Sequence, residues 1–396
     1  MPAALAFRRL PILILSLTLV PTALASTWHV DGVNGSDNND CRSRKHACKT
    51  ISNAISLTLP GDSIVVAPAT YHESIFIPYT LNIIGSGAKT TIVDPGGQQN
   101  QAAVVGSEPR VPVTLSRMTF RGAAGLIDSG GGIYNCFGTL TVLDSIITGN
   151  RIRGGNGIFG YGGGIYNCPS STLTLINTTV SDNSAEIGGA ICNGGALTII
   201  NSTFSGNVAR HRGGAIGNHG FLVITNSTFS GNSSGSSGHA GGILNGGLFQ
   251  SSGTLVVNNG TLSDNTAGEG RGGAIFNVKG STVVLRNTIV ANNTGGNCHG
   301  TIISRGYNLS SDDTCLLNLE GDRNGLDPLL GPLSDNGGLT HTQALLPGSP
   351  AIDAGNPMGC RDINRQLLKT DQRGEPRPNR EDSGGCDIGA FERQRD

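Results

Sequence analysis

Aromatic and charged residues are scarce in this chain of 396 residues, and the charges nearly cancel. Phe, Tyr and Trp together make up 5% of the sequence, Asp, Glu, Lys and Arg 14%, and the formal net charge is −1. This balance gives no electrostatic basis for binding nucleic acid or an anionic membrane. The chain has 61 glycines instead. Such a composition is unusual for an ordinary globule and suits short strands joined by many turns.

The N-terminus predicts a secretory signal peptide over residues 1–25. Arg8 and Arg9 precede an apolar run at 10–20, and small residues follow at 23–25, so we expect cleavage before Ser26. The apolar run is too short to span a bilayer as a helix, and no later segment is apolar enough to do so. We therefore expect a secreted protein, extracellular or on the outer-membrane surface, without a transmembrane segment after cleavage.

A repeated unit occupies residues 131–293. Each copy carries an isoleucine after a Gly-Gly or Gly-Ala pair, and these isoleucines are 32, 26, 25, 27 and 32 residues apart: Ile133, Ile165, Ile191, Ile216, Ile243 and Ile275. Periods of this length indicate a solenoid, in which a unit buries its apolar face only when its neighbours stack on it. Each unit contains two short apolar runs flanked by Gly, Asn and Ser, which favour strands and turns over a pair of helices.

Aligning the copies predicts which side chains face inward. The columns that begin at Leu140 and Val142 are apolar in all six copies, whereas the column that begins at Leu143 ends in Asn258 and Arg286, which predicts exposure to water. A third apolar column, beginning at Ile147, has the opposite parity, so the chain must turn between the two strands. Strand, turn, strand and turn with like residues stacked predict an all-β protein, a parallel β-helix.

Three asparagine-rich columns fit this fold. Asparagine tolerates the left-handed conformation at turns, and stacked amides hydrogen-bond from coil to coil. Sites that bind a ligand do not recur six times along a solenoid, so we interpret the columns as structural ladders. The columns are Asn135/Asn167/Asn193/Asn218/Asn245/Asn277, Asp144/Asn177/Asn201/Asn226/Asn259/Asn287 and Asn150/Asn183/Asn207/Asn232/Asn265/Asn293.

The repeat and the C-terminal region each resemble a known family. The motif GGAI-x-N followed by LTI-x-NSTFSGN, complete at 188–207, resembles the polymorphic outer-membrane protein repeat, which implies a right-handed, pectin-lyase-like β-helix. Residues 311–396, with LPGSPAIDAG at 346–355 and CDIGAFE at 386–392, resemble the choice-of-anchor Q domain of bacterial surface proteins. That fold serves lyases, hydrolases and adhesins, so the resemblance predicts architecture and not activity.

These patterns divide the chain into four parts. Residues 1–25 form the signal peptide and 26–80 an N-terminal cap with the first coil, including a short amphipathic helix within 49–57. The parallel β-helix extends over 81–310 in about ten coils. Residues 311–396 form the choice-of-anchor Q-like module, an irregular C-terminal cap in which Asp371, Arg373, Asp387 and Glu392 are expected to form a buried ion-paired network that closes the last coil.

The insertions between repeats fall at one position and should form a single variable face. Loops carried by a rigid scaffold are the usual place for binding, although a solvated rim without function is the plainer alternative. Arg151 and Arg153 lie on this face, and its densest basic cluster is at 210–212. The candidate binding residues are Glu186, Arg210, His211, Arg212, His239, Glu269 and Arg271. Its histidines lack metal-ligand spacing, so we predict no metal site and no cofactor.

Catalysis is disfavoured by the spacing of the carboxylates. Asp182 and Asp264 share a column but lie three coils apart, roughly 14 Å, whereas glycosidase carboxylates work about 5–9.5 Å apart. Two pairs within a single coil remain open as acid–base pairs: Asp182 with Glu186, and Asp264 with Glu269. We therefore predict a non-catalytic adhesin or glycan-binding rod whose partner is a polysaccharide or a cell-surface glycan. The alternative is a lyase or glycoside hydrolase acting on uronic-acid polymers, and Ca²⁺ enters only in the lyase case.

Nine cysteines behind a signal peptide predict four disulfides and one free thiol. Proximity in sequence favours Cys41–Cys48, Cys298–Cys315 and Cys360–Cys386. Cys136 and Cys168 each follow a ladder asparagine, so they should lie in register at a separation that a disulfide can bridge. Cys192 precedes its asparagine, faces the other way, and is the predicted free thiol.

Overall fold

The structure is a computed structural model that describes residues 25–97, 100–106, 112–125, 129–154, 159–247, 251–379 and 385–395. The predicted signal peptide lies outside these residues except for its last position. Within the described residues, no helix is long and apolar enough to cross a membrane.

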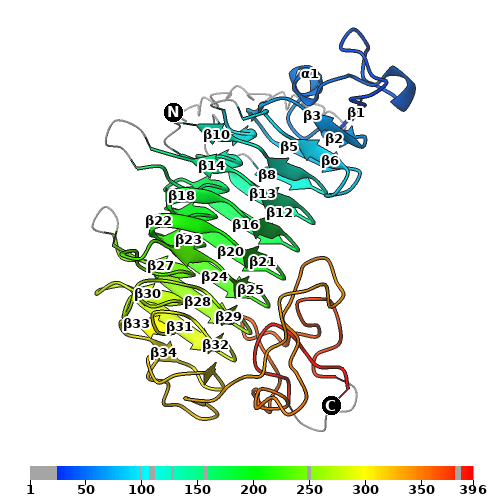
Figure 1. Ribbon diagram of the computed structural model, residues 1–396. Helices are drawn as coiled ribbons and strands as arrows, with labels where there is room; N and C mark the ends of the chain where they lie inside the picture. Colours follow the sequence, from blue (N-terminus) through cyan, green and yellow to red (C-terminus); the bar gives the residue numbers. More distant parts are fainter. Residues whose placement is uncertain are drawn as a thin grey trace, which may run out of the picture.

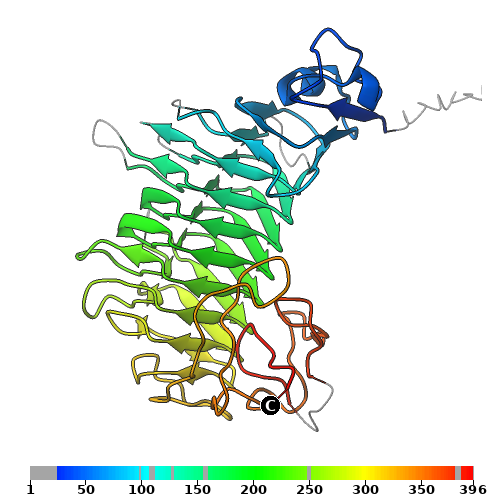
Figure 2. The same ribbon diagram turned by 45° about the vertical axis from the view of Figure 1, so that its right-hand side comes forward.

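The chain forms a parallel β-helix of about ten coils, as predicted from the repeats (Figures 1 and 2). Sheet 1 has 11 strands: β1 (Thr27–Val30), β2 (Ser63–Val66), β5 (Leu81–Gly85), β8 (Pro112–Ser116), β12 (Thr139–Leu143), β16 (Thr172–Ile176), β20 (Ala196–Ile200), β24 (Phe221–Thr225), β28 (Thr254–Asn258), β31 (Thr282–Arg286) and β34 (Ile303–Ser304). Sheet 2 has 10: β3 (Ala69–Tyr71), β6 (Thr91–Val93), β9 (Thr119–Arg121), β13 (Ile146–Thr148), β17 (Thr179–Ser181), β21 (Thr203–Ser205), β25 (Thr228–Ser230), β29 (Thr261–Ser263), β32 (Ile289–Ala291) and β35 (Leu309–Ser310).

Two further sheets complete the coils. Sheet 3 has 9 strands: β4 (Ile75–Ile77), β7 (Ala103–Val105), β11 (Ile133–Asn135), β15 (Ile165–Asn167), β19 (Ile191–Asn193), β23 (Ile216–Asn218), β27 (Ile243–Asn245), β30 (Ile275–Asn277) and β33 (Cys298–His299). Sheet 4 has 5: β10 (Ala124–Gly125), β14 (Arg151–Ile152), β18 (Ser184–Ile187), β22 (Val208–Arg212) and β26 (Ser233–Ser234). Sheet 4 lies where the sequence predicted variable loops, so those insertions are partly ordered into strands of their own.

The core follows the predicted columns. Leu140, Leu173 and Leu197 pair in register across β12, β16 and β20, and all three side chains are fully buried. The N-terminal region, which covers the first coil, contains the 3₁₀ helix η1 (Arg44–His46) and the helix α1 (Ile51–Leu57). The buried side chains of α1, Ile51, Ala54 and Ile55, join the same core as the coils, which protects the first strands from solvent.

The asparagine ladders that begin at Asn135 and Asn150 run from coil to coil as predicted, whereas in the turn column the bonds between coils are Asn177 to Asp144 and Asn287 to Asn259. Asn167 Nδ2 donates to Asn193 Oδ1 at 2.7 Å, and Asn193 Nδ2 donates to Asn218 Oδ1 at 2.8 Å, with these side chains fully buried. The turn column adopts positive φ at Asp144 and at all five asparagines that follow it, between 46° and 53°. Asparagine tolerates this conformation better than most residues, which explains why it recurs at this turn.

All four predicted disulfides form, and Cys192 is free and buried. The Cα atoms of Cys136 and Cys168 lie 4.9 Å apart on adjacent coils, as their shared register required. Cys192 is paired in register with Tyr166, two positions before Cys168. Positions two apart share a face of a strand, so Cys192 is separated from the Cys136–Cys168 column by its place along the strand and not, as predicted, by facing the other way.

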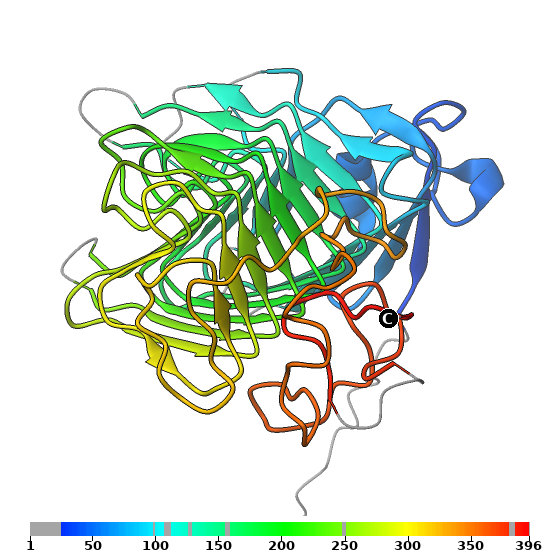
Figure 3. The ribbon, with the colours of Figure 1, turned by 60° about the horizontal axis from the view of Figure 1, so that its bottom comes forward.

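The C-terminal region does more than close the end of the coil. Leu317 joins the main core and Cys315 bonds to Cys298, so residues 311–324 cover the last coil. The following segment then doubles back along the outer side of sheet 2, beside β25, β29 and β32 (Figures 1 and 3). A second apolar cluster fills this contact, built from Ile289, Ala291, Leu309, Leu345, Ala351, Ile388 and Phe391.

This docked segment corrects one sequence expectation. The column beginning at Leu143 was predicted to face water throughout, yet Thr225 and Asn258 are 6% and 2% exposed. The turn column beside it is used for docking: Asn226 Nδ2 donates to Thr370 O at 2.9 Å, and Asn287 Nδ2 donates to Asp387 O at 2.9 Å. The exposed surface of these coils is therefore decided by a segment about 100–145 residues further along the chain.

Candidate functional site

Sheet 4 presents alternating side chains to the core and to the solvent. Ile152, Ala185 and Ala209 point inward and are at most 7% exposed. Their neighbours point outward, and the register aligns Arg151 with Ser184. The same period-two pattern that builds the core therefore places polar side chains in rows along the outer face.

A groove of about 740 Å³ crosses four successive strands of sheet 4. Because parallel strands stack along the helix axis, a groove that crosses β14, β18, β22 and β26 runs along that axis. Arg151, Arg153 and Arg210 line it with exposed side chains. An adjoining hollow of about 420 Å³ shares Arg151 and Arg153 and reaches Ala124 and Gly125 on β10, which extends the basic surface by one coil.

Glu186 lies in the middle of this groove, and its carboxylate is already hydrogen-bonded to backbone N–H groups. Its Oε2 atom accepts hydrogen bonds from the N–H groups of Gly154 at 3.0 Å and Gly160 at 2.9 Å. The carboxylate thus holds the ends of the loop that connects β14 to sheet 3. Glu186 was predicted as a binding residue, and in the structure its carboxylate shapes the wall of the groove.

His211 and Arg212 turn toward a second cavity, of about 260 Å³, which they line with Phe159 and His239. The ring of Phe159 meets His211 edge to face at a centroid distance of 5.4 Å. Arg212 Nη1 donates to Gly247 O at 3.3 Å, which directs its guanidinium across the coils. The predicted 210–212 cluster is therefore divided: Arg210 belongs to the groove, and the next two residues belong to the second cavity.

His239 and Arg271 form a pair at the edge of this second cavity. Arg271 Nη1 lies 2.5 Å from His239 Nε2, and burial, Arg271 and Arg212 lower the pKa of His239. A neutral imidazole accepts the hydrogen bond from the guanidinium. Phe276 packs edge to face on His239 and stacks on His299 at 4.2 Å. Glu269, also a predicted binding residue, is exposed and lines neither cavity.

Asp182 and Asp264, the two carboxylates that share a column, do not converge. Strand register places Ser181 and Ser263, the residues before Asp182 and Asp264, three coils apart, as the sequence predicted. Asp264 Oδ2 accepts a hydrogen bond from Gln343 Nε2 at 2.9 Å, so it belongs to the contact with the C-terminal segment. In the described part of the chain, no group of three or more His, Cys, Asp or Glu side chains is placed to hold a metal ion.

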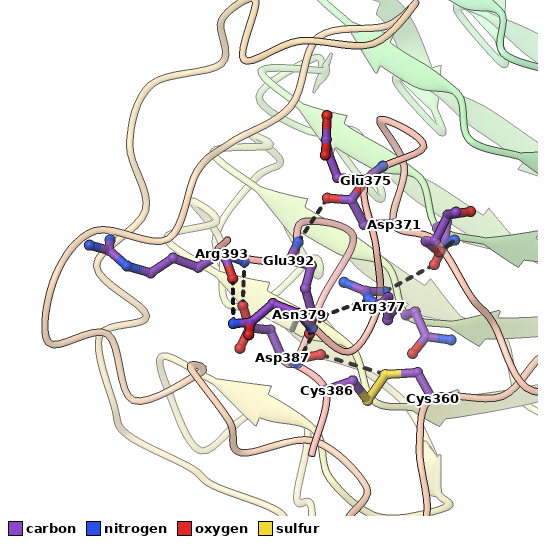
Figure 4. Close-up of polar contacts among 12 residues, drawn as sticks. Cys360, Asp371, Glu375, Arg377, Asn379, Cys386, Asp387, Glu392 and Arg393 are labelled. Carbon is purple, nitrogen blue, oxygen red and sulfur yellow. Dashed lines mark hydrogen bonds and ion pairs between the residues drawn. A yellow bond between two sulfur atoms is a disulfide. The ribbon is translucent and has the colours of Figure 1, made fainter. Parts of the chain in front are cut away.

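A buried network of charges lies in the C-terminal segment (Figure 4). Arg377 Nε contacts Glu392 Oε2 at 2.8 Å and Arg373 Nη2 contacts Asp371 Oδ2 at 2.8 Å. Burial and the neighbouring Glu392 raise the pKa of Asp387 to about 7. The network was expected to close the last coil, but Arg377 Nη1 donates to Asn226 Oδ1, at 3.1 Å, so it lies against the flank of the coils instead.

The sequence-based choice of candidate binding residues left out Arg151 and Arg153, which line the groove. Both were assigned to the variable face, but the basic run at 210–212 was taken as its centre. The alternation of Arg, Ile and Arg at 151–153 is typical of a strand with both charges facing outward. This pattern was the sequence signal that could have indicated these two arginines.

Comparison with known proteins identifies the architecture. No protein-family model matches the chain, and no curated protein matches it. Among solved structures, the pectate lyase Pel9A is similar with a TM-score of 0.52 at 18% identity, over 93% of this chain and 97% of the lyase. A GH136 lacto-N-biosidase from Eubacterium ramulus has a TM-score of 0.45 at 11% identity, covering 72% and 64% of the two chains. XylC in complex with xylose has a TM-score of 0.40 at 10% identity, covering 92% and 98%.

The likeness to Pel9A is a likeness of fold. It defines the class of protein as a right-handed parallel β-helix of the pectin-lyase type, as the repeat motif implied.

Proposed function

We propose that this chain is a secreted β-helix protein that binds an anionic polysaccharide in the groove over sheet 4 without cleaving it. The observation that carries the proposal is the row of exposed arginines, Arg151, Arg153 and Arg210, along a groove that crosses four strands. Guanidinium groups suit carboxylate and sulfate groups because they offer paired N–H donors. Single exposed contacts are weak and sensitive to salt, so several along one chain are needed for useful affinity.

Two features argue against glycosidase-type hydrolysis in this groove. Glu186, the carboxylate among the groove-lining residues, already accepts two backbone hydrogen bonds. Glycosidase chemistry needs a pair of carboxylates about 5–9.5 Å apart. Among its described lining residues, the groove therefore offers cationic positioning without the carboxylate pair of a glycosidase.

The alternative is a lyase or hydrolase of uronic-acid polymers. The observation in its favour is the coverage of nearly the whole of the pectate lyase Pel9A, with a TM-score of 0.52. Under this alternative, Ca²⁺ would enter as a cofactor. The fold alone does not decide between the two because it carries several activities.

We assign a surface role to the remaining regions. Four disulfides fit an oxidising compartment, in keeping with the signal peptide predicted at residues 1–25. We propose that residues 311–396 are related to the choice-of-anchor Q domain. We propose likewise that residues 131–293 are related to the polymorphic outer-membrane protein repeat. Together these support an adhesin-like rod at the cell surface whose partner is a glycan.

The proposal is tested by titrating the mature protein with uronate oligosaccharides of defined length in a calorimeter, at low and high salt. We expect binding that weakens with salt, and a loss of about tenfold when Arg153 and Arg210 are both changed to Ser. Arg44→Ser is the matched control, since Arg44 is an exposed arginine of the N-terminal region and does not line the groove.

Turnover is measured on the same samples. New unsaturated ends and new reducing ends are followed with and without Ca²⁺. Steady turnover would replace the binding function with the enzymatic one, and undetectable binding by the parent protein would remove the proposal altogether.

A further inference from the structure

The charges of the sheet 4 groove follow the strands in an alternating order. β14 contributes Arg151, and Arg153 follows directly after it, while β22 contributes Arg210. Between them, β18 presents the neutral Ser184 beside the engaged carboxylate of Glu186. The strand after β22 offers serines and a glycine to the groove, at positions 233–235. Positive charge is thus found on one coil, is absent from the next, and returns on the third.

Backbone pairing sets the distance between these charges. Strands β14 and β22 are separated by one strand, so their backbones lie roughly 10 Å apart. The inward side chains Ile152, Ala185 and Ala209 are buried, and the buried ladder of Asn150, Asn183 and Asn207 runs beside them. The scaffold that carries the arginines is therefore rigid, and the arginines keep a fixed spacing. A ligand must match this spacing in order to contact both coils.

The geometry of acidic polysaccharides makes such a spacing selective. In an extended polysaccharide, each pyranose lengthens the chain by about the spacing of two adjacent coils. In a two-fold chain, such as a β-1,4-linked mannuronate, successive sugars face opposite ways, so carboxylates on one side recur on every second sugar. In a three-fold chain, such as an α-1,4-linked galacturonate, they recur on every third.

We propose that the groove selects extended, two-fold polyuronates, whose carboxylates on the protein-facing side meet the arginines of the β14 and β22 coils. This inference rests on the proposed function and names the ligand class of the same site. The sugars between the bound carboxylates lie over Ser184, whose hydroxyl group is a hydrogen-bond partner for the sugar hydroxyls. Val208, 45% exposed and in register with Ser184, offers an apolar surface for a pyranose face.

A charge-relocation variant tests the spacing separately from the charge. In Ser184→Arg/Arg210→Ser the net charge is unchanged, but the arginines now lie on the adjacent coils of β14 and β18. Mannuronate and galacturonate oligosaccharides of equal length and charge are the two probes, and Arg210→Lys is the variant that keeps the charge in place. Thermal unfolding of each variant confirms that it is folded.

We expect the parent protein to bind the mannuronate oligosaccharide about tenfold more tightly than the galacturonate one. The relocation variant should lose this preference, and Arg210→Lys should retain most of it. Equal binding of the two probes by the parent, or an unchanged preference in the relocation variant, would overturn the inference while leaving the proposed function standing. Failure of the parent to bind either probe would instead remove the proposed function.

Discussion

Arg377 and Glu392 form a fully buried ion pair that joins the C-terminal segment to the flank of the β-helix. The two side chains are 0% exposed, with Nε and Oε2 2.8 Å apart, and Arg377 Nη1 also donates to Asn226 Oδ1 at 3.1 Å. Asn226 belongs to the turn column of the repeats, so one guanidinium connects the two parts of the chain. Burying both charges is costly unless each keeps its partner.

Removal of one partner should therefore be strongly destabilising. We expect Arg377→Met to lower the free energy of unfolding by about 3–5 kcal/mol, because it breaks the buried ion pair with Glu392. Urea denaturation followed by circular dichroism measures the change. The exposed pair Arg121–Asp94 is the control: Arg121→Met should cost less than about 1 kcal/mol. Equal costs for the two substitutions would contradict the assignment of a buried pair.

Asp387 should make stability depend on pH. Burial and Glu392 raise its pKa from 3.8 to about 7, so the folded state holds a proton that the unfolded chain has already released. The free energy of unfolding should decrease as pH rises between about pH 4 and pH 7, by at most roughly 4 kcal/mol from this group. The Asp387→Asn variant cannot bind that proton.

The measurement compares the pH slopes of unfolding for parent and variant. Asp387→Asn should show a smaller decline over this window than the parent, whatever the contribution of other carboxylates, whereas Asp313→Asn, at an exposed site, should follow the parent. Parallel curves for the parent and Asp387→Asn would show that Asp387 does not titrate in this range.

The asparagine ladder makes a third prediction. Asn193→Ala removes the acceptor for Asn167 and the donor for Asn218 inside the core, so we expect a loss of roughly 1–3 kcal/mol in thermal or chemical unfolding. Asn38→Ala, at an exposed turn, should change stability by a few tenths of that amount. Unchanged unfolding of Asn193→Ala would mean that the ladder does not contribute to stability.

The cysteines make a fourth prediction. Burial raises the pKa of Cys192 to about 12, so iodoacetamide should leave the native protein unmodified and should label a single thiol once denaturant is added. Peptide mapping without reduction should recover Cys136 linked to Cys168. A peptide that links Cys168 to Cys192 would contradict the register that pairs Cys192 with Tyr166.

Much of the architecture was predictable because it repeats. The inward columns at Leu140 and Val142, the ladder through Asn193 and the Cys136–Cys168 disulfide all follow from register, since each coil meets a near copy of itself. The candidate site was predictable only in outline. The variable face was found, but its division into a groove with Arg210 and a cavity with Arg212 depends on the alternation and the bulge of β22.

The sequence by itself determined the β-helix, its inward faces, its ladders and its disulfide pairs, because stacking interactions between neighbouring coils are encoded in every repeat. Only the tertiary structure decided that the C-terminal segment lies along sheet 2, that Thr225 and Asn258 are buried beneath it, and that Glu186 holds a loop instead of standing free. These features depend on contacts between segments that do not repeat and lie far apart in the chain. No periodic pattern records such contacts, and they form only when the whole chain is folded.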